Sequence, residues 1–413
     1  MKLFIGIVIC VLISSNTFSQ YVQWRGPARS GIFPETGLLQ SWPEQGPELI
    51  LKADSIGSGF STPVLENGII YVTGKRDEDD YLNAIDLEGK HLYQVKYGRS
   101  WENSYPDTRS TPTVDGDKIY VISGSGQVVC INKINGEIIW SVFAHEKYNG
   151  EIHRWGVAES PLIVDNKVIY TNGGDEASVI AFDKLTGDEI WKTESVGGTR
   201  TYVSPIVYQH GDLRQIIAST SENVIGINPE TGEVSWKYVY LPEDPEQKGR
   251  AGISPNSAIF KGNEIFISKG YDQYGVMLTV AEDGMSVNEK WRTEVLDTHH
   301  GHYVNVGDYI YGSTWINNSK GNWACIKWDN GKPMYEETWK TKGPIAYADG
   351  MLYCWEERTG NFALVKATPK KFDIVSSFKI EEGSGPYWAH PYISDGKLLL
   401  RHGDILMVFN IKS

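Results

Sequence analysis

Apolar and polar residues alternate with a period of two along most of the chain from about residue 48 onward. This alternation is typical of β-strands, in which successive side chains point to opposite faces. The predicted strands are short, and most are bounded by Asp, Asn, Gly and Ser, which favour turns. No long stretch keeps the 3.6-residue apolar period of an amphipathic helix. The pattern therefore predicts an all-β protein with almost no helix.

A Ser/Thr-Pro or related step recurs before a short apolar strand. The steps are Thr62-Pro63, Thr111-Pro112, Ser160-Pro161, Ser204-Pro205, Ser254-Pro255 and His390-Pro391. The first five prolines follow one another at spacings of 49, 49, 44 and 50 residues. Proline fits the first residue of a strand, because no ladder hydrogen bond is lost there. A period of this length predicts a repeat architecture.

Each repeat reads as four strands. In the second repeat, the turns Asp115-Gly116 and Asn135-Gly136 separate short alternating strands, and the last strand carries Trp140. Asp-Gly and Asn-Gly between such runs favour hairpins, since these residues tolerate the positive φ of a type I′ turn. Looser copies bring the count to eight, and the last copy has only three strands of its own. The lone predicted strand from Glu48 to Ala53 can supply the fourth.

These repeats predict an eight-bladed β-propeller of four-stranded antiparallel blades, in which the strand at residues 48–53 closes the last blade. Closure removes exposed strand edges that would invite aggregation. We expect one propeller domain over residues 20–413.

Residues 1–19 have the layout of a secretory signal peptide. Met1 and Lys2 precede an apolar run from Leu3 to Ile13, and small residues precede a predicted cut after Ser19. An uncleaved membrane anchor is the alternative. We expect export to the periplasm or the outside of the cell, no transmembrane segment after signal removal, and a monomer.

Charge and cysteine content narrow the class of partner. The net charge of −13 argues against binding to nucleic acid or to anionic membrane surfaces. Beyond the signal, Cys130, Cys325 and Cys354 are widely spaced, which fits neither a disulfide framework nor a zinc motif.

The phrase Asp/Asn-x-x-Thr/Asn-Gly-x-x-x-Trp, which ends at Trp140, Trp191 and Trp236, resembles the repeat of pyrroloquinoline-quinone-like propellers. In that family the tryptophan docks between neighbouring blades. The segments Gln23 to Pro27 and Tyr387 to Pro391 resemble the amino-terminal signature and the last blade of exported bacterial members. The resemblance covers essentially the whole mature chain.

Two functional classes share this fold, and the resemblance leaves both open. Quinoprotein dehydrogenases hold pyrroloquinoline quinone and calcium on the propeller axis. Non-enzymatic scaffolds, such as the lipoprotein subunit of the outer-membrane β-barrel assembly machine, bind other proteins through inter-strand loops. Fold alone does not choose between them.

In the repeat register, residues just before the first strand of each blade converge on one end of the axis. The predicted ligand-binding residues there are Arg109, Arg154, Trp155, Glu159, Arg200, Tyr202, Arg250, Asn256, His300, His302, Trp388 and His390. Arginine forks and flat aromatic faces suit an anionic or sugar-like ligand. The alternative is a set of structural ion pairs, for instance Arg109 or Arg154 with Glu159, lining a water-filled tunnel.

Two sets of residues are candidate metal ligands. His299, His300 and His302 lie together, and in extended backbone His300 and His302 share a face. Loop imidazoles bonded to their neighbours are the alternative. For calcium, which the resemblance to dehydrogenases implies, Glu176 and Asn256 are the candidates, against a solvated acidic turn and a strand-start cap.

The favoured interpretation is an exported, non-catalytic binding or scaffold propeller that engages a protein partner or a small ligand at the axial mouth. The alternative is a dehydrogenase of reduced size that uses pyrroloquinoline quinone and calcium to oxidise an alcohol or sugar. Neither cofactor is favoured, because the adjacent cysteine pair of many such enzymes is absent from the sequence. A ligand-sensing or carbohydrate-associated role is a third possibility.

Overall fold

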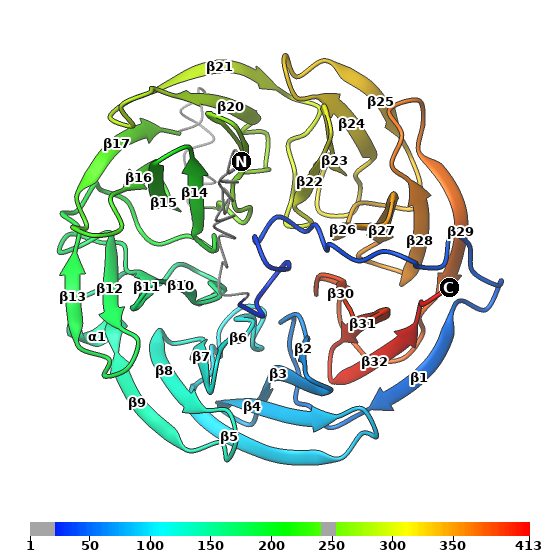
Figure 1. Ribbon diagram of the computed structural model, residues 1–413, viewed down its shortest axis with the longest axis horizontal. Helices are drawn as coiled ribbons and strands as arrows, with labels where there is room; N and C mark the ends of the chain where they lie inside the picture. The colour runs from blue at the N-terminus through cyan, green and yellow to red at the C-terminus, as the bar shows by residue number, and fades with distance from the viewer. Residues whose placement is uncertain (1–20, 241–252) are drawn as a thin grey trace, which may run out of the picture.

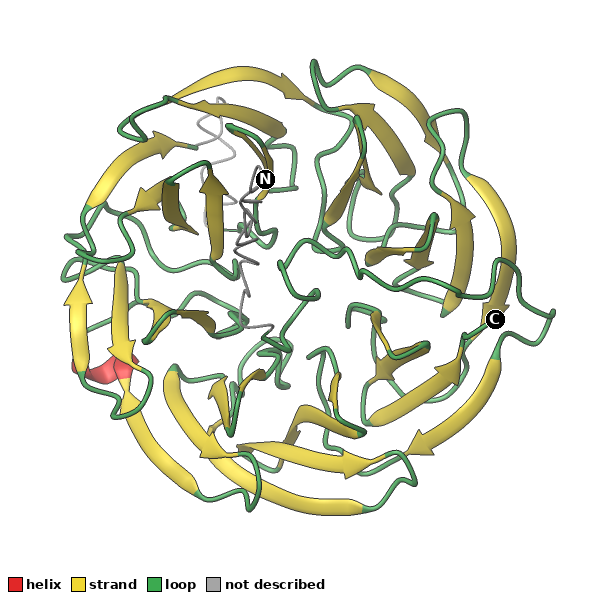
Figure 2. Cartoon of the chain, viewed as in Figure 1, coloured by secondary structure: helices red, strands yellow, loops and turns green. Residues whose placement is uncertain are grey.

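Strands of the repeat pair into separate four-stranded sheets, as the alternating pattern requires. The structure, a computed structural model, describes residues 21–240 and 253–413. Over those residues, eight antiparallel sheets form a ring around a central axis (Figure 1). The short helix α1 (Ala144–Lys147) interrupts an otherwise all-strand picture (Figure 2). The predicted eight-bladed propeller is confirmed.

Within each of the first seven blades, the strands follow chain order from the axis outward. Blades one and two comprise β2 (Val64–Glu66), β3 (Ile69–Arg76), β4 (Asp79–Asp86), β5 (His91–Arg99), β6 (Thr113–Asp115), β7 (Lys118–Ile122), β8 (Gln127–Asn132) and β9 (Ile138–Phe143). Blades three and four comprise β10 (Leu162–Val164), β11 (Lys167–Thr171), β12 (Val179–Asp183), β13 (Glu189–Lys192), β14 (Ile206–His210), β15 (Leu213–Ser219), β16 (Asn223–Ile227) and β17 (Val234–Val239). Blades five and six comprise β18 (Ile259–Lys261), β19 (Glu264–Ser268), β20 (Gly275–Val280), β21 (Val287–Thr293), β22 (Tyr303–Val306), β23 (Tyr309–Ser313), β24 (Trp323–Lys327) and β25 (Pro333–Glu337). Blade seven comprises β26 (Ile345–Ala348), β27 (Met351–Trp355), β28 (Asn361–Lys366) and β29 (Asp373–Lys379).

The last blade joins the two ends of the chain. Its own strands are β30 (Tyr392–Ser394), β31 (Lys397–His402) and β32 (Ile405–Asn410), and β1 (Glu48–Ala53) forms its outer edge. β1 runs antiparallel to β32, with Glu48 opposite Asn410 and Ala53 opposite Leu406. The predicted closing strand is therefore confirmed. The signal-peptide prediction falls on residues 1–19, which lie outside the described residues.

Tryptophans of the outer strands dock onto the next blade. The indole Nε1 of Trp140 donates to the carbonyl of Lys184, and that of Trp191 donates to the carbonyl of Pro229, each at 3.0 Å. Gly187 lies under the Trp140 ring with φ of +78°, and a Cβ there would come within 2.8 Å of the indole. The glycine of the repeat therefore permits both the turn and the docking of the preceding blade.

The inner strands are linked by the hydroxyls of the Ser/Thr-Pro steps. The backbone N–H of Thr62 donates to the Thr111 hydroxyl at 2.9 Å. The N–H of Thr111 donates to the Ser160 hydroxyl, and that of Ser160 donates to the Ser204 hydroxyl, each at 3.0 Å. These residues are buried, so each hydroxyl satisfies a backbone donor that water does not reach. The periodic step thus ties each of the first three blades to the next around the axis.

Residues 21–47 form a strap across one end of the axis. In Figure 1 the strap is the dark blue segment that crosses the centre of the ring. Val22 bridges to Val114 in blade two, and Ile32 bridges to Tyr347 in blade seven. The strap therefore connects blades on different sides of the axis.

Two strap arginines point into the ring and bind main-chain carbonyls. Arg29 Nη1 donates to the carbonyls of Ser160 at 3.0 Å and Pro205 at 3.2 Å. Arg25 Nη2 donates to the carbonyl of Tyr303 at 2.6 Å. Burial lowers the pKa of each arginine to about 9. Carbonyl dipoles from several blades thus stabilise two buried cations near the axis.

The three cysteines among the described residues, Cys130, Cys325 and Cys354, are buried and unpaired, and each lies inside a strand. Burial raises the pKa of the Cys130 and Cys325 thiols to about 12. No helix within residues 21–240 and 253–413 has the length and apolar character needed to cross a membrane.

Candidate functional site

Residues 32–47 of the strap and the predicted ligand-binding residues lie at opposite ends of the axis, whereas the strap residue Trp24 reaches inside the ring and contacts His302 and His390. The strap contacts the turns that follow the inner strands: Leu38 N–H donates to the Asp349 carboxylate at 2.9 Å, and Asp395 N–H donates to the Glu35 carboxylate at 3.1 Å. The predicted residues precede the inner strands, which begin at the other end. We call that second end the axial mouth.

An aromatic cluster around Trp388 spans four inter-blade connections at the mouth. The Trp388 ring lies 5.0 Å from Phe60, 5.4 Å from Tyr105 and 4.7 Å from His300, measured between centroids. The guanidinium carbon of Arg109 lies 5.8 Å from the centre of the Phe60 ring. Trp388, Phe60 and Arg109 are partly exposed and Tyr105 is 53% exposed, so their faces are accessible to a ligand.

A second cluster lies on the connections around blade three. His153 Nδ1 is 2.6 Å from the Tyr202 hydroxyl, which also accepts the backbone N–H of Trp155 at 3.2 Å. The Trp155 and Tyr202 rings are 5.6 Å apart, and the Arg154 guanidinium lies 5.5 Å from the Trp155 ring. The positive charges of Arg109 and Arg154 both act on the Tyr202 hydroxyl, although burial, the larger effect, raises its pKa. The two clusters therefore belong to one mouth.

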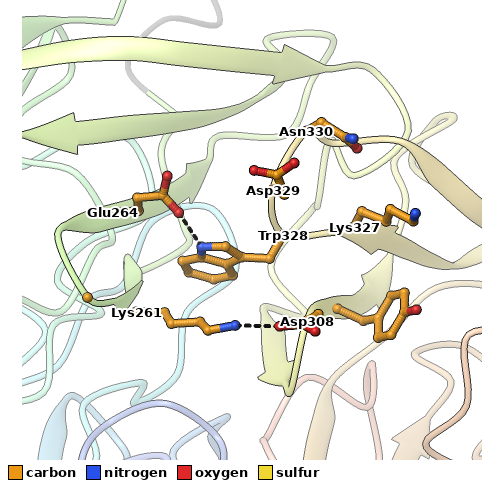
Figure 3. A pocket seen from close by; sticks show the side chains of 9 residues that line it. Lys261, Glu264, Asp308, Lys327, Trp328, Asp329 and Asn330 are labelled. Atoms are coloured by element: carbon orange, nitrogen blue, oxygen red, sulfur yellow. Dashed lines mark hydrogen bonds and ion pairs between the residues drawn. The ribbon is translucent and has the colours of Figure 1, made fainter.

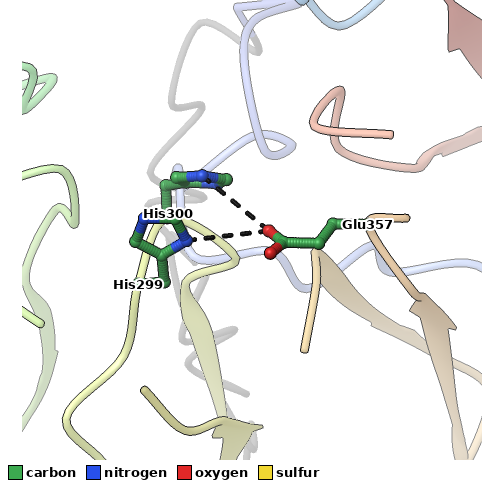
Figure 4. A group of neighbouring side chains, drawn as sticks. All are labelled: His299, His300 and Glu357. Carbon is green, nitrogen blue, oxygen red and sulfur yellow. Dashed lines mark ion pairs between the residues drawn. The ribbon is translucent and has the colours of Figure 1, made fainter. Parts of the chain in front are cut away.

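His299 and His300 face Glu357 of blade seven in the wall of the mouth (Figure 4). Glu357 Oε2 lies 3.6 Å from His299 Nδ1 and 3.8 Å from His300 Nε2. The other carboxylate oxygen, Oε1, is 2.8 Å from Lys342 Nζ. Burial lowers the pKa of both imidazoles well below 6.5, so both are neutral at neutral pH.

Sequence reasoning missed Glu357, Lys342, Tyr271 and Trp315. The Tyr271 hydroxyl is 2.7 Å from His299 Nε2, and the Trp315 ring is 4.7 Å from the His299 ring. Glu357, Tyr271 and Trp315 lie on turns between second and third strands, which open on the same end as the predicted residues but carry no repeated motif. One feature of the sequence could have identified Glu357: it follows the second strand of its blade, as the calcium candidate Glu176 does in blade three.

Glu159 and Arg200 do not face the mouth surface. Their carboxylate and guanidinium are 2.7 Å apart, and both side chains are fully buried. Glu159 also accepts the backbone N–H of Thr171 at 3.1 Å, and Arg200 donates to the Tyr170 hydroxyl at 2.8 Å. Glu159 therefore forms a structural ion pair, as the alternative interpretation proposed, but its partner is Arg200 and neither Arg109 nor Arg154.

The structure separates His302 from His299 and His300. His302 Nε2 accepts the backbone N–H of Ser257 at 3.1 Å, and its Nδ1 lies 3.1 Å from Nε2 of the buried His390. Both ring nitrogens thus have partners. The expectation that His300 and His302 share a face assumed extended backbone, but His302 has φ of +58° and precedes β22. The ring of Trp24, from the strap, lies 4.9 Å from His302 and forms the floor beneath it.

The calcium candidates do not form an oxygen-rich site. Asn256 is buried; its Nδ2 donates to the carbonyls of Thr298 and His299, each at 2.7 Å, and its Oδ1 accepts the N–H of His302 at 3.2 Å. Glu176 is exposed on the turn between β11 and β12. Calcium takes about six to eight oxygen ligands. Because both ends of the Asn256 amide already have partners, Glu176 and Asn256 do not fit the calcium site that the resemblance implies. Arg250 lies outside the described residues.

A hollow between blades five and six lies away from the mouth (Figure 3). Its charged and aromatic side chains bind one another. Lys261 Nζ is 2.8 Å from the Asp308 carboxylate, and Trp328 Nε1 donates to Glu264 at 2.7 Å. These contacts join the two blades, so we regard the hollow as structural.

Known proteins resemble this chain in sequence and in fold. The family model described as outer membrane protein assembly factor BamB matches residues 78–372. The chain belongs to this family. The BamB structure from Moraxella catarrhalis covers 88% of the chain with a TM-score of 0.63 and 11% identity, over 99% of its own length. A europium-containing methanol dehydrogenase covers 91% of the chain with a TM-score of 0.65 and 12% identity, over 88% of its own length. At 11–12% identity, the similarity to these structures shows the fold alone. Together with the family match, it confirms the resemblance to pyrroloquinoline-quinone-like propellers.

Sequence relatives of this BamB-family chain include enzymes. The quinohemoprotein alcohol dehydrogenase ADH-IIG of Pseudomonas putida is 27% identical over 190 residues, which is 44% of the chain and 25% of the enzyme. The quinohemoprotein alcohol dehydrogenase ADH IIB of the same species is 26% identical over 164 residues, which is 38% of the chain and 22% of the enzyme. The chain thus spans about a quarter of the length of these curated relatives. The chain is therefore similar both to an outer membrane protein assembly factor and to alcohol dehydrogenases.

Proposed function

We propose that the chain is an exported, non-catalytic binding propeller that holds a small anionic or sugar-like ligand at the axial mouth. The observation that carries the proposal is the arc of partly exposed aromatic rings and arginines contributed by several inter-blade connections. Its members are Phe60, Tyr105, Arg109, His153, Arg154, Trp155, Tyr202, His300 and Trp388. A protein partner that inserts a loop into the same arc is the second occupant to consider.

The chemistry of the arc favours a flat, oxygen-rich ligand. Indole and phenol faces pack against the apolar side of a sugar ring, and guanidinium groups bind carboxylates with paired donors. Arg109 uses donors on the carbonyls of Asp107 and Tyr105, which fix its side chain against Phe60. Guanidinium has five N–H donors, so this fixing leaves further donors for a ligand.

Titration with an acidic sugar tests the proposal. The probe is a trimer of galacturonic acid, followed by the quenching of tryptophan fluorescence, with the uncharged galactose trimer as its reference. We expect saturable quenching by the acidic trimer and at least a tenfold loss of affinity in Trp388→Ala. Trp388 contributes a large ligand face, and burial of such a face is worth about 1.5–3 kcal/mol. Unchanged affinity in Trp388→Ala would place the binding site elsewhere.

A quinone-dependent alcohol dehydrogenase is the second candidate, and the partial match to such enzymes is what favours it. The test is to incubate the purified chain with pyrroloquinoline quinone and calcium, remove unbound quinone by gel filtration, and measure dye reduction with ethanol. Because Asn256 is occupied by backbone partners, we expect no retained quinone and no reduction. Retained quinone with ethanol-dependent reduction would replace the binding proposal.

A further inference from the structure

Three ligand-type atoms face one another in the wall of the mouth without bonding to one another. His299 Nδ1, His300 Nε2 and a Glu357 carboxylate oxygen all lie within 4.8 Å of one another. The two imidazole-to-carboxylate distances, 3.6 and 3.8 Å, are too long for hydrogen bonds. Zinc binds nitrogen at about 2.0–2.1 Å and carboxylate oxygen at about 2.0–2.2 Å, so ligands in tetrahedral arrangement lie about 3.3–3.5 Å apart. Small side-chain shifts would bring the three atoms onto one ion.

The Nδ1 atom of His299 is the strongest sign that something is bound there. It is buried, and among the described residues it has no hydrogen-bond partner. Buried polar atoms nearly always have a partner, and each exception calls for an ion, a water or a function. This nitrogen points at Glu357, as Figure 4 shows. A metal ion between the two groups would satisfy it.

The outer contacts of His299 and Glu357 orient these two side chains as metal ligands. The Tyr271 hydroxyl at 2.7 Å holds His299 Nε2, which leaves Nδ1 for the ion. Lys342 binds Glu357 Oε1, while Oε2 faces the histidines and also accepts the Trp388 indole N–H at 3.2 Å. Ligand histidines and carboxylates characteristically have such supporting bonds on their other atoms.

The donor set selects the class of ion. Two imidazole nitrogens and one carboxylate oxygen suit zinc and similar divalent transition metals, whereas calcium and magnesium need more oxygen ligands. Three protein ligands leave a fourth position open. His300 is partly exposed, with 22% of its side chain accessible, so the open position would face the mouth.

We propose that His299 Nδ1, His300 Nε2 and Glu357 Oε2 bind one divalent transition-metal ion of the zinc type in the wall of the axial mouth. The open position of the ion would take an oxygen of the ligand in the mouth. That last point rests on the proposed function, whereas the metal site itself does not.

Zinc binding by the full mature chain tests the site. The protein is dialysed against a chelator, and Zn²⁺ affinity is measured by competition with a chromophoric chelator, together with metal content after gel filtration. We expect one zinc per chain and a loss of affinity of at least tenfold in both His300→Ala and Glu357→Gln. His210→Ala, at the exposed end of β14, is the matched control and should keep the zinc affinity of the unsubstituted chain. Excess Ca²⁺ or Mg²⁺ should not displace the zinc.

A second measurement keeps the test independent of folding defects. Co²⁺ in place of zinc should give the visible absorption of a four- or five-coordinate ion, which His300→Ala should alter while the circular dichroism stays unchanged. The absence of stoichiometric zinc, or equal affinity in the chain and both variants, would overturn the metal site. The acidic-sugar titration of the metal-free chain is a separate readout, so failure of the metal site and failure of the binding proposal are distinguishable.

Discussion

At the scale of single residues, some buried side chains near the axis bind a neighbouring blade. The Ser160 hydroxyl, which accepts the N–H of Thr111, is one example, and the Glu159–Arg200 pair is another. Both positions are buried, so a group that loses its partner destabilises the fold by its full desolvation free energy. Residue-scale predictions therefore concern stability as much as binding.

Replacement of Ser160 by Ala should lower the free energy of unfolding by about 1–3 kcal/mol, because the buried N–H of Thr111 loses its acceptor. Urea unfolding measures the change. Ser141 is exposed on the outer strand β9, where its hydroxyl accepts a hydrogen bond from the side chain of Gln127. Ser141→Ala should therefore lower the free energy of unfolding by about 0.5 kcal/mol or less. Equal costs for the two variants would show that the inner hydroxyls do not join the blades.

The sequence predicted which positions lie near the axis but not which partners they choose. The proline spacing fixed the register of the inner strands, and with it the general location of Arg109, Trp155 and Trp388. The partner of Glu159 could not be read in the same way, because it depends on how side chains of neighbouring blades meet. His302 was misjudged for a local reason, since its positive φ breaks the strand geometry that the pairing with His300 assumed.

The buried histidines predict an acid sensitivity. Burial lowers the pKa of His302 and His390 well below 6.5, with the charge of Arg25 acting in the same direction. Folded imidazoles then stay neutral where unfolded ones take up protons, so stability should fall as the pH drops below about 6.5. Each histidine contributes up to about 1.4 kcal/mol per pH unit. Urea unfolding between pH 5 and pH 8 measures this slope.

His390→Gln is the variant for that slope, since it removes one buried imidazole beside His302 while keeping a polar side chain. The variant should lose stability less steeply than the parent chain as the pH falls from 6.5 to 5. A slope identical to that of the parent would mean that His390 does not stay neutral in the folded state.

At the scale of elements, the last two blades are completed by segments from the beginning of the chain. β1 completes the last blade, and Trp42 of the strap packs against Tyr353, Phe362 and Phe378 of blade seven, whose outer strand has no tryptophan. The repeat pattern predicted β1, because the last copy lacked a strand. It did not predict the strap, which has neither alternation nor repeat and is positioned by buried arginines.

Replacement of Arg29 by Ala should destabilise the propeller by about 3 kcal/mol or more, because the carbonyls of Ser160 and Pro205 lose their donor. Arg76→Ala, at the partly exposed end of β3, is the control and should have a small effect. Thermal unfolding compares the two variants. A melting temperature for Arg29→Ala equal to that of the control would mean that the strap does not hold the inner strands together.

At the scale of the whole molecule, the fold separates structural from ligand-facing surfaces. The strap occupies one end of the ring, the docking tryptophans occupy the blade contacts, and the partly exposed aromatic and basic groups gather at the mouth. The sequence located this mouth through the register of the repeat. It could not show the meeting of His299 and His300 with Glu357, because these residues come from different blades and no motif links them.

Charge-matched variants at two places on the ring test the mouth as the binding site most directly. Arg109→Gln removes one positive charge at the mouth, and Lys261→Gln removes one at the hollow between blades five and six. Affinity for the galacturonic acid trimer is measured for both by fluorescence titration at one salt concentration. We predict a loss of about tenfold or more in Arg109→Gln, as expected for a charge-assisted hydrogen bond, and no change in Lys261→Gln. Equal affinities in the two variants would contradict the assignment of ligand binding to the mouth.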